Sequence, residues 1–124
     1  MKLLRVGSSA REKSVSRQLA EAFVIAWKKQ CPEGEIVRRD LAATVIPAIN
    51  DEWVAAARLD PTKCSPEANR ILGLSDELII ELEAANVVLI GVPMYNFTIS
   101  AALKGWIDQT VRPGRTVQYS AQGQ

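Results

Sequence analysis

Hydrophobic and polar positions change their spacing along the chain in segments that predict strands and helices in turn. Short segments predict three strands, at residues 2–7, 35–41 and 86–92, and the last of these is an uninterrupted apolar run. Apolar residues at helical spacing predict three main helices, at residues 14–30, 65–85 and from about 100 to 113. This β-α-β-α-β-α order is typical of an α/β domain whose parallel strands are joined by right-handed crossovers.

The run from Asn86 to Val92 is the most informative of the three strands. It is β-branched and uncharged, which predicts a strand buried on both faces of a parallel sheet. It leads into Pro93-Met94-Tyr95-Asn96-Phe97, a loop with a thioether, a phenol and an amide. Open α/β sheets bind ligands just outside the carboxyl ends of their strands, so this loop is the best candidate for one wall of a site.

The first helix is expected to begin after Ser14 as N-cap and to stop before Pro32. Its apolar positions predict one core-facing side, made of Val15, Leu19, Phe23, Ala26 and Trp27. Its charged positions are expected to face away from that side, at Arg17, Glu21, Lys28 and Lys29.

Two segments are less regular. Residues 42–64 contain two prolines and the pattern of one short helix at about 52–58. Two interpretations of Trp53 within them stay open: its side chain covers a ligand or a partner subunit, or it only packs against the core. Near the end of the chain, residues 116–119 have the pattern of a further strand.

Composition and charge describe a single globular domain over residues 1–124. The chain is 48% hydrophobic and 23% charged, and 15 basic against 14 acidic residues leave a net charge of +1. This balance provides no bulk field for nucleic acid or a membrane surface. Because charge interrupts the N-terminal apolar residues, and no apolar stretch reaches the about 20 residues of a membrane span, we expect a cytoplasmic protein without a signal peptide.

The chain has no histidine, and its two cysteines, Cys31 and Cys64, are far apart in the sequence. Metal sites usually need closely spaced ligands, so we expect free thiols and no metal site. The absence of histidine also removes the usual general base near neutral pH. Any chemistry would therefore come from other side chains or from a cofactor.

A second candidate loop follows the first strand, which ends in Gly7-Ser8-Ser9 before a helix that starts at Ser14-Val15-Ser16. Hydroxyls and the N–H groups of a helix N-terminus together favour a phosphate, although serines at such positions are often caps alone. The dinucleotide motif Gly-x-Gly-x-x-Gly is absent. In a sheet of order 2-1-3 this loop would lie beside Met94-Tyr95-Asn96-Phe97. The two loops together would suit flavin mononucleotide (FMN), with its phosphate at one loop and its ring at the other. The alternative is that Tyr95 and Phe97 only pack at the rim of the sheet.

Several motifs resemble the FMN-dependent NADH-azoreductase family, of the flavodoxin-like quinone-reductase superfamily. They are Ser8-Ser9, Ser14 to Leu19, Arg39 to Ala42, Leu74 to Leu78, Met94 to Phe97 and Leu103 to Asp108. The resemblance implies that Ser9, Ser14, Val15 and Ser16 hold the FMN phosphate, and that Met94, Tyr95, Asn96 and Phe97 lie along the isoalloxazine. Val15 departs from the polar residue often found there. The family further implies electron transfer from NADH to azo compounds or quinones by a homodimer, to whose interface Trp53 or Trp106 would contribute.

The chain is shorter than this resemblance requires. A five-stranded flavodoxin-like sheet needs roughly 150 residues or more, so we expect its C-terminal strands to be missing, together with a Ser-Arg-Gly-Gly-like loop. The third strand would then be left as an apolar edge. The chain would be a fragment, or partner chains would supply the rest. Alternatives to an enzyme are an FMN-binding electron carrier without turnover, which the net charge of +1 disfavours, and an inactive remnant.

Overall fold

The computed structural model describes residues 1–120, which form one parallel sheet covered by helices. Its strands are β1 (Lys2–Gly7), β2 (Glu35–Asp40) and β3 (Val87–Gly91), in the order β2-β1-β3. The α-helices are α1 (Val15–Gln30), α2 (Asp51–Ala57), α3 (Pro66–Glu83) and α4 (Ala101–Thr110), and a 3-10 helix, η1, covers Pro61–Lys63.

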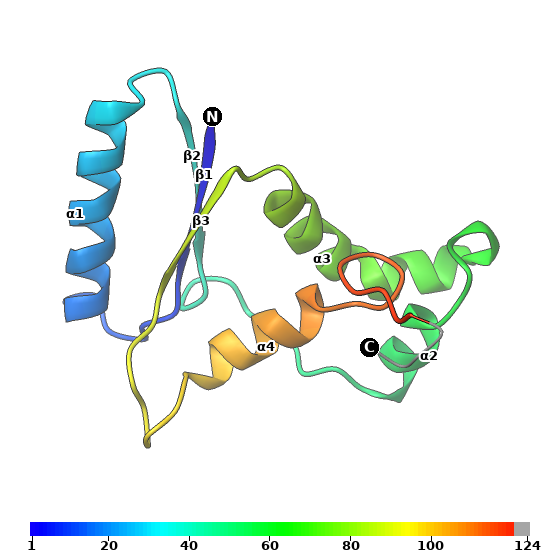
Figure 1. The fold of residues 1–124 in the computed structure, drawn as a ribbon. Coiled ribbons are helices and arrows are strands. Elements are labelled where there is room, and N and C mark those ends of the chain that lie inside the picture. Colours follow the sequence, from blue (N-terminus) through cyan, green and yellow to red (C-terminus); the bar gives the residue numbers. More distant parts are fainter. Residues whose placement is uncertain (121–124) are drawn as a thin grey trace.

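Helix α1 lies on one side of the sheet, and α3 and α4 lie on the other, with α2 packed beyond them against α3 (Figure 1). The α/β class, the strand order 2-1-3 and the presence of helices on both faces are thereby confirmed. No helix among residues 1–120 combines the length and the apolar character needed to cross a membrane.

Each α-helix begins where a polar side chain can cap it. The cap residues are Ser14, Asn50, Ser65 and Ser100, and the side-chain oxygen of each accepts the N–H group three residues later. Such a bond satisfies one of the N–H groups that the first turn leaves without a partner, and stabilises a helix by about 1 kcal/mol. The predicted starts at Ser14 and Ser65 are confirmed.

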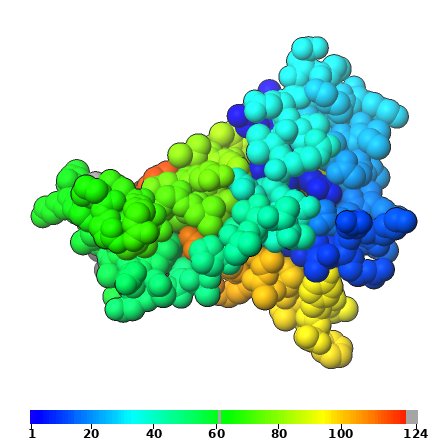
Figure 2. Space-filling model, turned by 180° about the vertical axis from the view of Figure 1, so that it is seen from behind, coloured from blue at the N-terminus to red at the C-terminus, as the bar shows by residue number. Residues whose placement is uncertain are grey.

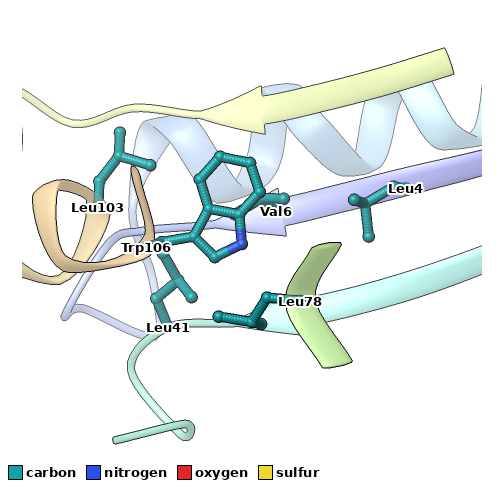
Figure 3. Close-up of a cluster of buried hydrophobic side chains, with 6 residues drawn as sticks. All are labelled: Leu4, Val6, Leu41, Leu78, Leu103 and Trp106. Carbon is teal, nitrogen blue, oxygen red and sulfur yellow. The ribbon is translucent and has the colours of Figure 1, made fainter. Parts of the chain in front are cut away.

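The main core lies between the sheet and the pair α3 and α4 (Figure 3). It contains alternate residues of β1, the residue after β2, and residues of both helices: Leu4, Val6, Leu41, Leu78, Leu103 and Trp106. The apolar positions expected at helical spacing in α3 and α4 include the core residues Leu78, Leu103 and Trp106, whereas the buried Leu72 and Ile79 of α3 lie outside the predicted stripe.

A smaller cluster joins α2 to α3 around Trp53, which packs with Ala56 and Leu72. The Trp53 indole N–H donates to Gln109 Oε1 at 3.0 Å. The reading of Trp53 as a packing residue is therefore the correct one. Trp106 is also buried within the chain, so neither indole is exposed for the subunit interface to which we expected one of them to contribute.

The predicted core-facing side of α1 is wrong. The buried residues of α1 are Ala20 and Val24, whereas Val15, Leu19 and Phe23 are 71%, 66% and 42% exposed. Small residues allow α1 to approach β3 closely, because a Cβ placed on Gly91 would lie 3.8 Å from the Ala20 Cβ. Helical spacing locates an apolar stripe but does not say which neighbour covers it.

The prediction that β3 is buried on both faces is also wrong for the described chain. Val88 and Ile90 share one face of the strand and are each 40% exposed. Within residues 1–120, β3 pairs with β1 alone, so its outer edge is open.

The strand predicted at residues 116–119 does not form. Residues 112–117 instead make a turn, in which Gly114 N–H donates to Val117 O at 2.9 Å and Thr116 Oγ1 accepts from Arg112 N–H. Gly114 has a φ of +77°, a conformation that glycine adopts without the strain of a side chain. A turn built on Pro113 and Gly114 thus replaces the extended backbone that the β-branched residues indicated.

Candidate functional site

The loops after β1 and β3 meet at one edge of the sheet because the two strands are neighbours. Ser8 fixes the meeting point, since its hydroxyl donates to Gly91 O at 2.8 Å. A cleft of about 350 Å³ lies between the loops, within the range typical of small-molecule sites. Its lining residues are Ser9, Arg11, Ser14, Val15, Ser16, Leu19, Val92, Pro93, Met94 and Tyr95.

One end of the cleft is the N-terminus of α1. Ser14 Oγ accepts the Arg17 N–H at 3.2 Å and lies 3.2 Å from Ser16 Oγ. The N–H groups of Val15 and Ser16 belong to the first turn and have no intrahelical acceptor. No acidic residue lies in this turn, and Arg11 lines the cleft nearby. Partial positive charge from the helix and a full charge from Arg11 make this end suitable for an anion.

Ser9 also lines the cleft, although it is only 1% exposed. Its hydroxyl accepts the Arg11 N–H at 3.2 Å, so it shapes the loop from within. Its carbonyl oxygen accepts a 2.8 Å hydrogen bond from Arg17 Nη2. Ser9 therefore helps to give this loop its shape through both its hydroxyl and its carbonyl oxygen.

Arg17 and Asp40 support the loop, and sequence reasoning missed both. The Arg17 guanidinium donates to both carboxylate oxygens of Asp40, at 2.8 and 2.9 Å. This hydrogen-bonded pair raises the pKa of Arg17 and lowers the pKa of Asp40 below its ordinary value. Arg17 was expected to face away from the sheet. Its place three residues after an N-cap, together with an aspartate ending the neighbouring strand, was the available signal.

The other wall is the loop after β3, which makes a tight reversal. Tyr95 and Thr98 exchange two backbone hydrogen bonds of 2.9 and 3.1 Å. Between them Asn96 and Phe97 have φ values of +49° and +65°, the pattern of a type I′ turn. Phe97 is 95% exposed, and the loop projects from the body of the molecule as the yellow lobe of Figure 2.

Six of the eight predicted site residues line the cleft: Ser9, Ser14, Val15, Ser16, Met94 and Tyr95. Asn96 and Phe97 do not line it and lie at the tip of the turn. The structure thus brings the serine loop and the start of the 94–97 loop together at one cleft, while the rest of the 94–97 loop lies outside it.

A larger hollow, of about 570 Å³, lies elsewhere, between α2, α3 and the 112–115 turn. None of the predicted site residues lines it, and its buried Arg112 is paired with Asp76. This hollow is remote from the carboxyl ends of β1 and β3, where an open α/β sheet presents its ligand site.

The described part of the chain contains no group of three or more His, Cys, Asp or Glu side chains placed to share a metal ion. Cys31 and Cys64 are free thiols, as the sequence predicted.

A family model described as "Flavodoxin-like fold" matches residues 1–124. The chain belongs to this family. It is 46% identical, over 99% of its length, to FMN-dependent NADH:quinone oxidoreductase 1 of Trichormus variabilis, and 48% identical, over 95% of its length, to an FMN-dependent NADH:quinone oxidoreductase of Acidobacterium capsulatum.

Among solved structures, an azoreductase from Bacillus anthracis is similar with a TM-score of 0.88 and 28% identity, over 98% of this chain. The similarity covers only part of the length of these proteins. The chain spans 60% and 57% of the two quinone oxidoreductases and 61% of the azoreductase chain. The predicted family resemblance and flavodoxin-like fold are confirmed over that span.

Proposed function

We propose that the cleft binds FMN and serves an oxidoreductase that passes electrons from NADH to quinones or azo compounds. The observation that carries this proposal is the meeting, across one cleft, of an anion-binding helix N-terminus with a wall that contains Met94 and Tyr95. The printed names of two relatives, both FMN-dependent NADH:quinone oxidoreductases, support the same cofactor, donor and acceptor.

The residues of the cleft fit the two chemically different ends of FMN. Its phosphate would be held by the N–H groups of Val15 and Ser16, the hydroxyls of Ser14 and Ser16, and the charge of Arg11. Its ring would lie toward Met94 and Tyr95, and we propose that Asn96 and Phe97 extend this wall.

When bound, FMN supplies the redox chemistry, while the protein supplies position and electrostatics. This division of labour suits a chain without histidine. No side chain of the cleft is required as a nucleophile, and Ser9 contributes by giving the loop its shape.

We propose further that the protein acts as a homodimer in the cytoplasm. The exposed apolar residues of α1 support the first part, because apolar side chains on one helix are commonly covered at an interaction site. Val15, Leu19 and Val92 line the cleft and are also exposed, so a second chain covering them would border the site.

A charge reversal at the cleft tests the proposal. The purified chain is titrated with FMN, followed by the flavin's visible absorption and fluorescence, beside the variants Arg11→Glu and Lys29→Glu. Both changes alter net charge equally, but Lys29 lies at the far end of α1. We expect Arg11→Glu to weaken FMN binding about tenfold at low salt, and less at high salt, while Lys29→Glu has little effect.

Three results would count against the proposal: no FMN uptake by the wild type, an equal loss of FMN affinity in both variants, or a loss of affinity in Arg11→Glu that is the same at low and high salt. NADH consumption in the presence of a quinone then tests turnover. FMN uptake without that consumption would favour a flavin-binding module instead of an enzyme.

A further inference from the structure

The hydroxyl of Tyr95 interacts with the opposite loop. It accepts the backbone N–H of Ala10 at 3.2 Å and lies 3.5 Å from Ser9 Oγ. Tyr95 follows β3, whereas Ser9 and Ala10 follow β1, so this phenol joins two loops about 85 residues apart in the sequence. A residue expected only to line the flavin ring therefore also interacts with the phosphate end of the cleft.

The Ser9–Arg11 backbone is held by contacts from three sides. Tyr95 holds the Ala10 N–H, Arg17 holds the Ser9 carbonyl oxygen, and the Ser9 hydroxyl holds the Arg11 N–H. Arg17 is itself fixed by Asp40, but the Tyr95 contact is the one that comes from the far wall of the cleft.

The chemical setting of the phenol agrees with this role. The hydrogen bonds with Ser9 and with the Ala10 N–H lower the pKa of Tyr95 below its ordinary value of 10.0, and the positive charges of Arg11 and Arg17 act in the same direction. The lowered pKa is a consequence of the same contacts that join the phenol to the opposite loop.

We propose that the Tyr95 hydroxyl anchors the phosphate loop, so that Tyr95 is a positioning residue for the phosphate end of the flavin as well as part of the ring-side wall. This inference rests on the proposed function. Removing the hydroxyl as Tyr95→Phe leaves the aromatic ring in place but frees the Ala10 N–H, and the loop then loses one of its three supports.

The first test needs no flavin. Amide hydrogen exchange is measured in the unliganded chain, in Tyr95→Phe and in Tyr119→Phe, a matched control that removes the hydroxyl of the chain's second, exposed tyrosine. We expect the Ala10 amide to exchange about tenfold faster in Tyr95→Phe, with helix α1 and strand β1 unchanged, and no change in Tyr119→Phe. An unaltered Ala10 rate would overturn the anchor, whether or not the chain binds FMN.

The second test separates the phosphate from the ring by comparing FMN with riboflavin, which lacks the phosphate. We expect Tyr95→Phe to raise the dissociation constant of FMN about tenfold and that of riboflavin less than twofold. Equal changes for both ligands would show a ring contact and overturn the proposal, as would no change for either. Wild-type protein that takes up no FMN would refute the proposed function, and the exchange rates would then decide the anchor alone.

Discussion

Phe97 is the position where the structure predicts an unusual response to substitution. Its φ of +65° places an aromatic residue in left-handed backbone, and its 95% exposure shows that the ring gains almost no packing in return. Conformational cost without compensating contacts is a feature of residues that serve a ligand or a partner. We therefore expect truncation of Phe97 to affect stability through its backbone.

The magnitude follows from comparing alanine with glycine at the same site. Left-handed backbone costs a non-glycine residue about 1–2 kcal/mol, and glycine loses about 0.5–1 kcal/mol more conformational entropy on folding than alanine. The difference predicts that Phe97→Gly is about 0.5–1 kcal/mol more stable than Phe97→Ala. Gly73 provides the opposite case, because it lies inside α3 and an added Cβ would meet nothing within 4 Å. There the change to alanine should stabilise by about 0.5–1 kcal/mol.

Urea unfolding of the wild type and of the variants Phe97→Ala, Phe97→Gly and Gly73→Ala measures these differences in stability. The urea concentration at the midpoint of unfolding reports them, provided that the dependence of the unfolding free energy on urea has the same slope in all four. The expected result is an inversion: glycine is preferred at position 97 and alanine at position 73. If the Phe97→Ala variant is as stable as the Phe97→Gly variant or more stable, the turn relaxes out of the left-handed region and the strain argument fails. Both variants at position 97 lack the ring, so under the proposed function both should lose FMN affinity to a similar extent.

Three further predictions concern the framework around the site. Gly34→Ala should destabilise by about 1–3 kcal/mol in urea unfolding, because the new Cβ would lie 2.2 Å from Trp27 Cη2. Gln109→Ala should cost about 1–3 kcal/mol and alter the fluorescence of Trp53, whose buried N–H loses its acceptor. The carboxylate of Asp40 has a lowered pKa in the folded chain. The ionised carboxylate therefore stabilises the fold above about pH 4, and this stabilisation is lost as the pH falls through the pKa of Asp40 in the folded chain. Asp40→Asn should be less stable than wild type near neutrality and nearly equal to it in acid, and a constant difference across that range would contradict the pairing.

Local signals explain why so much of the fold could be read from the sequence. Ser14 and Ser65 cap helices through their own side chains, and the run from Val87 to Gly91 forms a strand because β-branched residues favour it. The order 2-1-3 then places the ends of two strands side by side. The position of the cleft follows from these local features once the order 2-1-3, which the flavodoxin-like resemblance implies, is added to them.

The errors arise where a distant partner decides the outcome. Helical spacing revealed the apolar stripe of Leu19 and Phe23, but the side that α1 buries is set by the close approach of Ala20 to Gly91. The Arg17–Asp40 pair joins the start of a helix to the end of another strand, so its signal is recognised only when the positions of both residues in the expected fold are considered together. The turn at Asn96 and Phe97 lacks the glycine by which a type I′ turn is usually recognised.

The two ends of the cleft differ in how firmly the chain holds them, and this difference bears on the proposed function. The backbone around Ser9 and Ala10 is fixed by hydrogen bonds with Tyr95 and Arg17, so the loop beside the proposed phosphate site has its shape before a ligand binds. The turn at Phe97 is exposed and strained instead, with little packing to hold it. A flavin bound by its phosphate would thus have most of its affinity at one end and an accessible ring at the other. That arrangement suits a reaction in which a donor and an acceptor each need access to the ring.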